Sequence, residues 1–231
     1  MAALARRIVH REVLLQHWQR LQADRSTPLL DLDADAWGLG AVDVASLLAE
    51  LGARSAVVSR PDRVAAVAAD LTTHGVPLAL TADEASVAAA VATMPVFLSD
   101  AVSLQARVLR LKRVPAGTGV SYGHRYVTPA DTALALLCIG YADGIDRAAG
   151  GHCEVLIAGQ RRPIVGRVAM NVLVVDLGLA LADEVSLGDW GTLFGPVEAG
   201  APTVADWATG LGTQPAAVVT ALSPTLQREW R

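Results

Sequence analysis

Hydrophobic residues follow two different spacings along the chain, and the spacing changes near residue 100. In the first part, stretches with apolar residues three or four positions apart alternate with stretches of period two. Residues 11–22, for example, place Leu14, Trp18 and Leu21 on one helical face. The pattern predicts helices over 11–22, 42–52, 61–75 and 81–94 (the last with Thr81 and Glu84 at capping-box spacing) and strands over 28–37, 55–59, 76–80 and 94–99.

Alternating strands and helices indicate βα units and a parallel sheet. About four units are present, half of what a closed eightfold barrel needs. From residue 102 the chain instead shows short alternating strands with frequent glycines, as in an antiparallel β domain, and one helical pattern at 203–212. The predicted fold class is α/β plus β: a partial, half TIM-like βα barrel over 1–100, followed by a β domain over 101–231.

Composition excludes several classes of protein. The chain has 231 residues, is 52% hydrophobic and has a mean hydropathy of +0.38, so we expect a sizeable core. No apolar run is long enough for a membrane span, and early arginines argue against a secretory signal. A net charge of −4 with scattered basic residues gives no nucleic-acid footprint. Cys138 and Cys153 lack metal-ligand spacing, so free thiols in a cytoplasmic protein are expected.

Four motifs of the second half have a familiar order: "LKRVPAGTGVSYGHRY", "IGYADGIDR", "GRVAMNVLVVDL" and "SLGDWGTLFG". Together they resemble the C-terminal domain of alanine racemases. By that resemblance Tyr122 corresponds to the family's catalytic acid/base, which reaches across a dimer interface into the partner's barrel. Tyr141 and Met170 match positions that line the substrate entrance, and Arg167 matches a neighbouring arginine of the same motif.

The first half resembles the family more weakly, and its departures concern the cofactor. In "DLDADAWGLG", Asp33 stands where the family has the lysine that binds pyridoxal phosphate. Trp37 and Trp230 replace two tyrosines that hold the cofactor phosphate, and the later βα units seen in the family are missing from the pattern. Asn171 replaces an aspartate. Lys112, the one lysine of the chain, falls where ordinary members also have a lysine on a strand. We therefore expect neither pyridoxal phosphate nor any other cofactor.

The aspartates of residues 31–35 suggest chemistry of their own. If 28–37 is a strand, Asp31, Asp33, Asp35 and Trp37 lie on one face. Carboxylates that close together raise one another's pKa, so one could act as a general acid or base. A solvated face of a partial sheet is the plainer interpretation, and the binding of a divalent metal ion is a third. A calcium-binding loop is excluded, because Ala36 and Val42 stand where that loop needs Gly and Glu.

The sequence favours a pyridoxal-phosphate-independent isomerase, epimerase or cyclase that acts on a small organic substrate. Whether the protein is an enzyme stays open, since a non-catalytic binding or scaffold homologue, as a homodimer or as a partner of a true racemase, fits the same residues; a residual pyridoxal-phosphate racemase fits least. An open half barrel leaves strand edges to cover, which favours a homodimer. The predicted catalytic residues are Tyr122, Asp33 and Asp35, and the predicted substrate-binding residues are Asp31, Trp37, His124 (on the strand face of Tyr122), Tyr141, Arg167, Met170 and Asn171, with no metal ligands.

Overall fold

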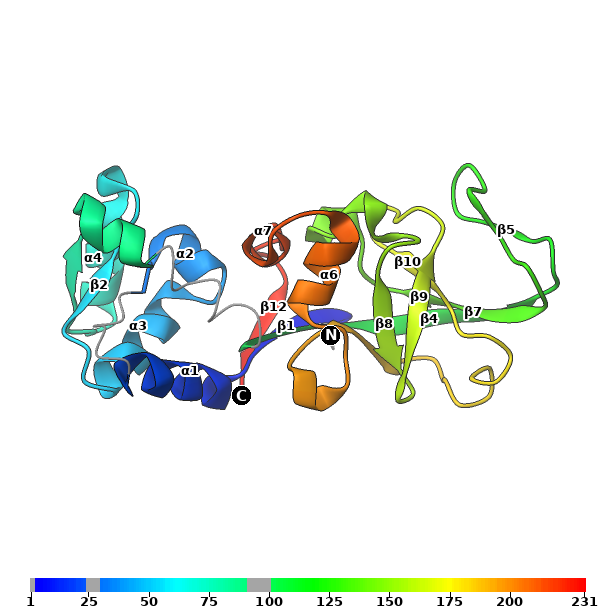
Figure 1. Cartoon of the computed structure of the whole chain (residues 1–231), viewed down its shortest axis with the longest axis horizontal. Coiled ribbons are helices and arrows are strands. Elements are labelled where there is room, and N and C mark those ends of the chain that lie inside the picture. The colour runs from blue at the N-terminus through cyan, green and yellow to red at the C-terminus, as the bar shows by residue number, and fades with distance from the viewer. Residues whose placement is uncertain (1–2, 24–29, 91–100) are drawn as a thin grey trace. The chain divides into compact units, whose positions relative to one another are not determined.

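The computed structural model describes residues 3–23, 30–90 and 101–231, which form two compact units (Figure 1). One unit, the αβ unit, is Arg11–Leu98, and the other, the β unit, combines Met1–His10 with Ser99–Arg231. The first ten residues thus belong with the second half of the chain, and not with the residues that follow them. The predicted strand at 94–99 lies outside the described residues.

Six antiparallel strands close into a small barrel in the β unit. Around the ring they are β4 (Val102–Val114), β7 (Thr132–Leu137), β10 (Leu173–Asp176), β9 (Gln160–Val165), β8 (Glu154–Ile157) and β11 (Trp190–Phe194). The long strand β4 closes the ring, because Arg107 on one edge accepts a hydrogen bond from the Cys138 amide and Val108 on the other donates to Asp189. The predicted antiparallel β domain is confirmed.

Two terminal strands extend this sheet. β1 (Ala5–Val9) runs antiparallel to β4 and parallel to β12 (Gln227–Trp230). Arg6 fixes the arrangement: its guanidinium pairs with Glu229 at 3.0 Å and lies 4.1 Å from the ring centre of Trp190. Arg107 lies at the same distance from that ring, so the indole is stacked between two cations. Arg6 and Glu229 are 223 positions apart in the sequence, which is why period and spacing did not place β1.

Apolar side chains from alternate strand positions fill the barrel, and two short helices cover one end of it. Trp207 on α6 (Val204–Leu211) packs edge-on against Phe194 with ring centres 5.6 Å apart. Thr203 caps α6 by accepting a hydrogen bond from the Asp206 amide. α7 (Pro215–Thr220) follows directly, and the connections carry three 3₁₀ turns, η2 (Tyr141–Asp143), η3 (Arg147–Ala149) and η4 (Val197–Ala199).

In the αβ unit the predicted helices are present, but the half barrel is not shown. The helices are α1 (Arg11–Ala23), α3 (Ala41–Glu50), α4 (Val64–Thr73) after the 3₁₀ turn η1 (Pro61–Arg63), and a helix over 84–90. The parallel sheet of the described residues consists of β2 (Ser55–Val57), β3 (Ala79–Thr81) and a single bridge from Asp31 to Val57. Three short parallel segments are too few to curve into half of a barrel.

Of the predicted strand over 28–37, residues 28–29 lie outside the described residues, Asp31 makes a single bridge to Val57, and the prediction is wrong beyond Asp31. Residues Asp33–Trp37 form one helical turn, α2, with φ between 50° and 60° from Ala34 to Trp37. A run of four non-glycine residues in the left-handed region is costly, and surrounding contacts must hold it. The alternation of Asp and Ala in this stretch imitates a strand, and a left-handed turn has no signal in hydrophobic spacing.

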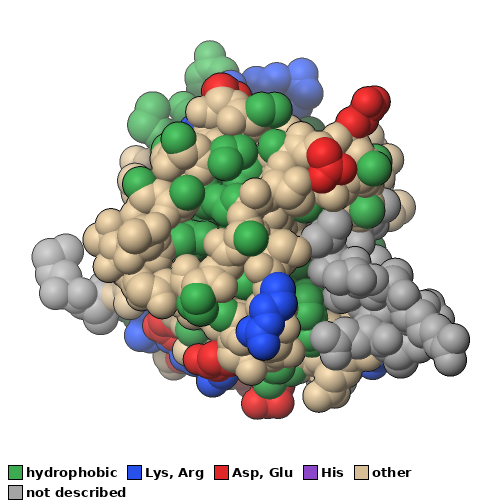
Figure 2. Space-filling model, turned by 90° about the vertical axis from the view of Figure 1, so that its left-hand side faces the viewer, with side chains coloured by type: hydrophobic (Ala, Val, Ile, Leu, Met, Phe, Trp, Pro, Cys, Tyr) green, Lys and Arg blue, Asp and Glu red, His purple; other side chains and the backbone are tan. Residues whose placement is uncertain are grey.

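The helix cap and the surface of the αβ unit are the remaining features of its fold. The helix over 84–90 is capped by Asp83, whose carboxylate accepts from the Ser86 amide, instead of by the predicted Thr81–Glu84 box. The face of the αβ unit that Figure 2 presents carries hydrophobic side chains over its middle, a basic side chain just below them, and acidic side chains towards its edges. Among the described residues, no helix has the length and apolar character needed to cross a membrane.

Candidate functional site

Asp33 is a buried carboxylate with all its acceptor positions in use. Only 3% of the residue is exposed, and its oxygens accept from Arg60 Nε at 2.6 Å, Arg60 Nη2 at 3.0 Å, the Ala34 amide at 2.7 Å and Ser59 Oγ at 3.3 Å. The hydrogen bond from Arg60 is the largest reason that the pKa of Asp33 falls to about 2. The expected rise in pKa is therefore wrong, because a cation, and not another carboxylate, is the nearest charge.

The other aspartates of this segment hold the backbone. Asp31 is 1% exposed and accepts from the Asp33 and Ser59 amides and from Trp37 Nε1, each at 3.0 Å. Asp35 is exposed and accepts from the Ala41 amide at 2.9 Å. The three carboxylates do not share one face, since Asp31 and Asp33 are buried and Asp35 is not. Together these bonds stabilise the left-handed turn and join it to the end of β2.

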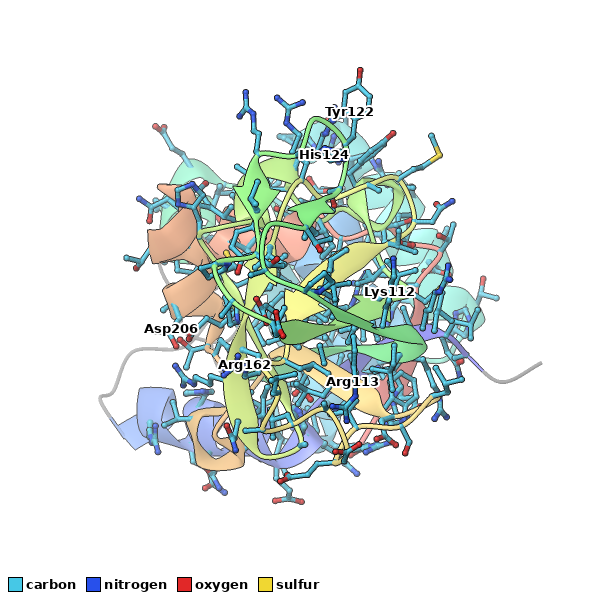
Figure 3. The ribbon with its side chains drawn as sticks, turned by 90° about the vertical axis from the view of Figure 1, so that its right-hand side faces the viewer. Lys112, Arg113, Tyr122, His124, Arg162 and Asp206 are labelled. Atoms are coloured by element: carbon cyan, nitrogen blue, oxygen red, sulfur yellow. The ribbon has the colours of Figure 1, made fainter. Side chains whose placement is uncertain are left out.

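Tyr122 lies in a different unit and in a very different environment. It is at the tip of a hairpin formed by β5 (Gly119–Val120) and β6 (Tyr126–Val127), and 81% of it is exposed. Figure 3 shows its phenol pointing away from the barrel. The tip is a strained turn, with positive φ at Ser121, Gly123 and His124. Such strain at an exposed aromatic side chain is typical of a functional loop.

Tyr141 and Met170 lie next to each other, as the resemblance implies. The amides of Tyr141 and Ala142 donate to the carbonyls of Ala169 and Met170 at 3.0 and 2.9 Å. A side chain at Gly140 would collide with this backbone, since its Cβ would lie 2.3 Å from the Ala169 oxygen. Both side chains are partly exposed, Tyr141 by 39% and Met170 by 54%. The two motifs thus form one apolar edge.

A cationic depression of about 540 Å³ lies beside this edge. Its lining includes Arg125, Arg147, Arg167 and His152, and the described lining residues include no carboxylate. Arg147 also stacks on Tyr141 at 5.3 Å, and Arg167 reaches to within 3.8 Å of the place where a Gly123 side chain would stand. Guanidinium groups without an acidic partner attract carboxylates and phosphates. Arg125, Arg147 and His152 were not predicted; the arginine in "GYADGIDR" was the available signal.

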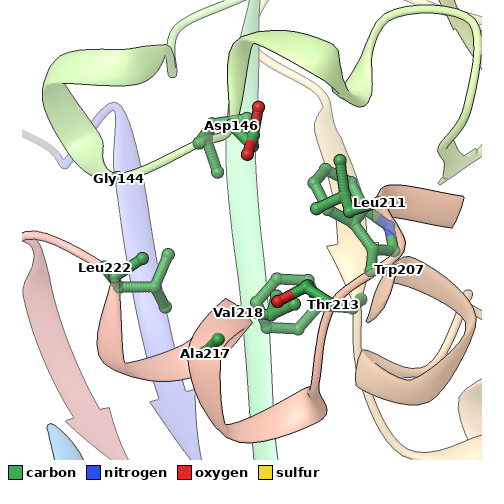
Figure 4. Close-up of a pocket in the computed structure, with 11 residues that line it drawn as sticks. Gly144, Asp146, Trp207, Leu211, Thr213, Ala217, Val218 and Leu222 are labelled. Atoms are coloured by element: carbon green, nitrogen blue, oxygen red, sulfur yellow. The ribbon is translucent and has the colours of Figure 1, made fainter. Parts of the chain in front are cut away.

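A second cavity is apolar and carries no comparable chemistry. It has a volume of about 130 Å³ and lies between α6, α7 and the segment around Gly144 (Figure 4). Among its described lining residues Asp146 is the one ionisable group, and its carboxylate already accepts from the Ala148 amide at 2.7 Å. We therefore place the candidate site at Tyr122, the Tyr141–Met170 edge and the cationic depression.

Three further residues were singled out in the sequence: His124 and Asn171 as substrate-binding residues, and Lys112 as an ordinary strand lysine. The ring of His124 lies against Gly119 of its own hairpin, and His124 is in a turn, so it does not share a strand face with Tyr122. Asn171 is exposed next to Met170. Lys112 lies on β4, apart from the hairpin tip in Figure 3. No group of His, Cys, Asp and Glu within the described part of the chain could hold a metal ion.

A family model and the curated relatives of this chain point to the same protein family. A family model described as the alanine racemase C-terminal domain matches residues 101–230. The alanine racemase of Mycobacterium leprae is 42% identical over 184 residues, which is 80% of this chain and 45% of the relative. The alanine racemase of Mycobacterium ulcerans is 49% identical over 134 residues, 58% of this chain and 34% of the relative. The chain therefore spans less than half the length of the curated relatives that it matches.

Solved structures support the fold. An alanine racemase from Clostridium difficile 630 in complex with cycloserine has a TM-score of 0.81 at 18% identity, over 100% of this chain and 96% of that one. Alanine racemase from Bartonella henselae, with covalently bound pyridoxal phosphate, has a TM-score of 0.79 at 16% identity and covers both chains fully. At these identities the likeness concerns the fold alone.

The expectation of no cofactor is wrong, since the matched family includes the structure with covalently bound pyridoxal phosphate. The residues of this chain do not by themselves fit that group. Covalent attachment needs an amine, the αβ unit has no lysine in its sequence, and the Asp33 carboxylate is committed to Arg60. Trp230 Nε1 is buried without a hydrogen-bond partner, but an indole supplies one donor and no acceptor.

Proposed function

The chain belongs to the alanine racemase family, and we propose that it acts as the tyrosine-donating member of an amino-acid racemase whose pyridoxal phosphate is held by another polypeptide. The match over 101–230 supports this role, because that segment contains the hairpin, the apolar edge and the cationic depression. The observation that carries the proposal is the exposure of Tyr122 at the tip of its hairpin. A tyrosine that is 81% exposed on a strained, projecting hairpin is placed to meet a surface outside its own chain.

Tyr122 offers the chemistry that racemization needs from one side of the substrate. Inversion at a carbon atom requires a proton to leave one face and another to arrive at the opposite face. A phenol can donate and accept a proton at Oη, which suits Tyr122 for one of the two faces. The electron sink for the reaction would come from pyridoxal phosphate on the partner.

The surroundings of Tyr122 suit a small amino acid. Arg147 and Arg167 bring positive charge next to the hairpin and would attract the substrate carboxylate. Tyr141 and Met170 would cover the site from water when a partner closes over them. The saturated Asp33–Arg60 pair gives the αβ unit a structural role in this scheme, because a carboxylate with four donors and a pKa of about 2 is a poor proton acceptor near neutral pH.

The partner that fits best is an alanine racemase chain with a complete barrel, because it supplies the lysine that this chain lacks. A homodimer of this chain, which the sequence favoured, would bring two Tyr122 hairpins to two αβ units that lack that lysine. The cytoplasmic location and the small-molecule substrate stay predictions.

Association tests this role directly. We expect mass photometry of an equimolar mixture with Mycobacterium leprae alanine racemase to show a mixed dimer. Met170→Asp should weaken it at least about tenfold, since an acid there is buried on docking. Leu187→Asp is the matched control, because Leu187 is 66% exposed and lies on the loop before β11; it should leave the mixed dimer intact. Two homodimers with no mixed species would overturn the proposal.

A further inference from the structure

The hairpin that carries Tyr122 has a single polar attachment to the barrel. Among the hydrogen bonds of the described residues, those of Gly119–Val127 stay within the hairpin apart from one, which Tyr126 Oη donates to Asp176 Oδ2 at 2.8 Å. The tip also rests on Gly166, where a Cβ would lie 2.9 Å from the Ser121 side chain. This hydrogen bond, the close contact at Gly166 and the burial of Val120 together fix where the hairpin points.

Asp176 is a rigid acceptor for that bond. It ends β10, is 7% exposed, and also accepts from Thr132 Oγ1 at the start of β7 and from the Gly178 amide at 3.0 Å. Burial pulls the pKa of Asp176 upward, but the bonds from Thr132, Gly178 and Tyr126 outweigh it and the pKa is lowered. The carboxylate therefore stays ionised and holds two strands and the hairpin at one point.

Tyr126 is correspondingly kept as a donor. Burial first, and then the bond to Asp176, raise the pKa of Tyr126 to about 12, so its hydroxyl remains protonated through the range in which enzymes work. Tyr126 pairs with Val120 across the hairpin and stands four residues after Tyr122. A displacement at Tyr126 is thus transmitted through a two-residue strand pair to the tip.

We propose that Tyr126 is a positioning residue for Tyr122, with its hydroxyl fastening the exposed hairpin to Asp176 of the barrel so that the Tyr122 phenol is presented in one orientation. The inference rests on the proposed function for its catalytic consequence, but the fastening itself can be measured without any activity.

Hydrogen exchange provides that measurement. In Tyr126→Phe, which keeps the ring and removes the donor, we expect the amides of 119–127 to exchange about five- to tenfold faster, while those of β7 and β10 keep their rates. Thr132→Val is the matched control, because it removes another donor from the same carboxylate without touching the hairpin; exchange in 119–127 should then stay unchanged. Unchanged exchange of the hairpin in Tyr126→Phe would overturn the fastening.

Kinetics test the consequence. The mixed assembly is made with a Mycobacterium leprae racemase whose own catalytic tyrosine is changed to Phe, so that Tyr122 is the one available. We expect Tyr126→Phe to lower kcat about tenfold with KM nearly unchanged, since orientation and not binding is lost. Asp176→Asn keeps an acceptor and should lie between wild type and Tyr126→Phe in both assays. Faster exchange with wild-type kcat would refute positioning.

A failure of the proposed function looks different. If Tyr122→Phe leaves racemization by the mixed assembly unchanged, the tyrosine-donating role is wrong, while the exchange rates still decide whether Tyr126 fastens the hairpin.

Discussion

Replacing Asp33 with Asn should destabilise the αβ unit by an amount that the structure allows us to estimate. The substitution keeps the shape of the side chain and removes the charge that Arg60 contacts through two nitrogens. Arg60 would then face a neutral amide, and the left-handed turn at Ala34–Trp37 would lose part of what holds it. The expected loss is confined to this unit, because the Asp33 side chain accepts its hydrogen bonds from residues between Ala34 and Arg60.

The magnitude follows from the pKa. Asp33 is shifted from 3.8 to about 2, and each pKa unit corresponds to about 1.4 kcal/mol, which gives an upper value of about 2.5 kcal/mol. The Arg60 side chain is 55% exposed, so solvent screens the pair and we expect about 1–2 kcal/mol at pH 7. Since the folded pKa is below the unfolded one, this stability is present above about pH 4 and is lost as the pH falls towards 2. At pH 3 the difference between wild type and Asp33→Asn should narrow by roughly half.

Urea titrations followed by the methyl signals of Leu48 and Val57 report on this unit alone, at pH 7 and at pH 3. Asp62→Asn is the control, because Asp62 is exposed and adds only long-range charge to Arg60; its change should stay below about 0.5 kcal/mol. Equal midpoints for Asp33→Asn and wild type at pH 7, or a difference that does not shrink at pH 3, would refute the reasoning.

The β unit gives two further predictions, one for a pair of glycine substitutions and one for the labelling of its two cysteines. Gly144→Ala should lower the melting temperature of the β unit far more than Gly151→Ala. Both glycines have positive φ, but a Cβ at Gly144 would lie 2.0 Å from the Ala221 oxygen, whereas a Cβ at Gly151 would have no atom within 4 Å. Similar melting temperatures for the two variants would contradict this contact. Iodoacetamide at pH 8 should label Cys138 before Cys153, since burial raises the pKa of Cys153 to about 12 and Cys153 is the more buried thiol; peptide mapping that finds Cys153 labelled first would show that the core opens there.

The β unit could be predicted well because its information is local. Period-two strands, turn glycines and four ordered motifs lie between residues 102 and 195, and each motif forms the turn or strand that its residues favour. The roles expected of Tyr122, Tyr141, Met170 and Arg167 came from the resemblance of these motifs to the alanine racemase family, and those roles stay predictions. The helices α1, α3 and α4 could be predicted equally well, since the three- and four-residue spacing of apolar side chains is a direct consequence of helix geometry.

The features that could not be predicted from the sequence depend on contacts between distant residues or on an unusual backbone conformation. β1 depends on Arg6 meeting Glu229 and Trp190, which no short window of sequence contains. The Asp33–Arg60 pair could have been suspected, because both residues follow buried parallel segments and the carboxyl ends of such segments meet at one edge. The left-handed turn could not, because the alternation of Asp with apolar residues has the period of a strand. The hydrogen bonds of Asp31 and Asp33 that hold the turn leave no mark in that period.

The most direct test of the account is racemization in trans. A Mycobacterium leprae alanine racemase that carries pyridoxal phosphate but has its own catalytic tyrosine replaced by Phe is mixed with this chain, and interconversion of D- and L-alanine is measured. We predict that wild-type chain restores activity and that the Tyr122→Phe chain, which associates equally well, does not. A mixed dimer that stays inactive with the wild-type chain would contradict the central claim that Tyr122 serves a cofactor held by another polypeptide.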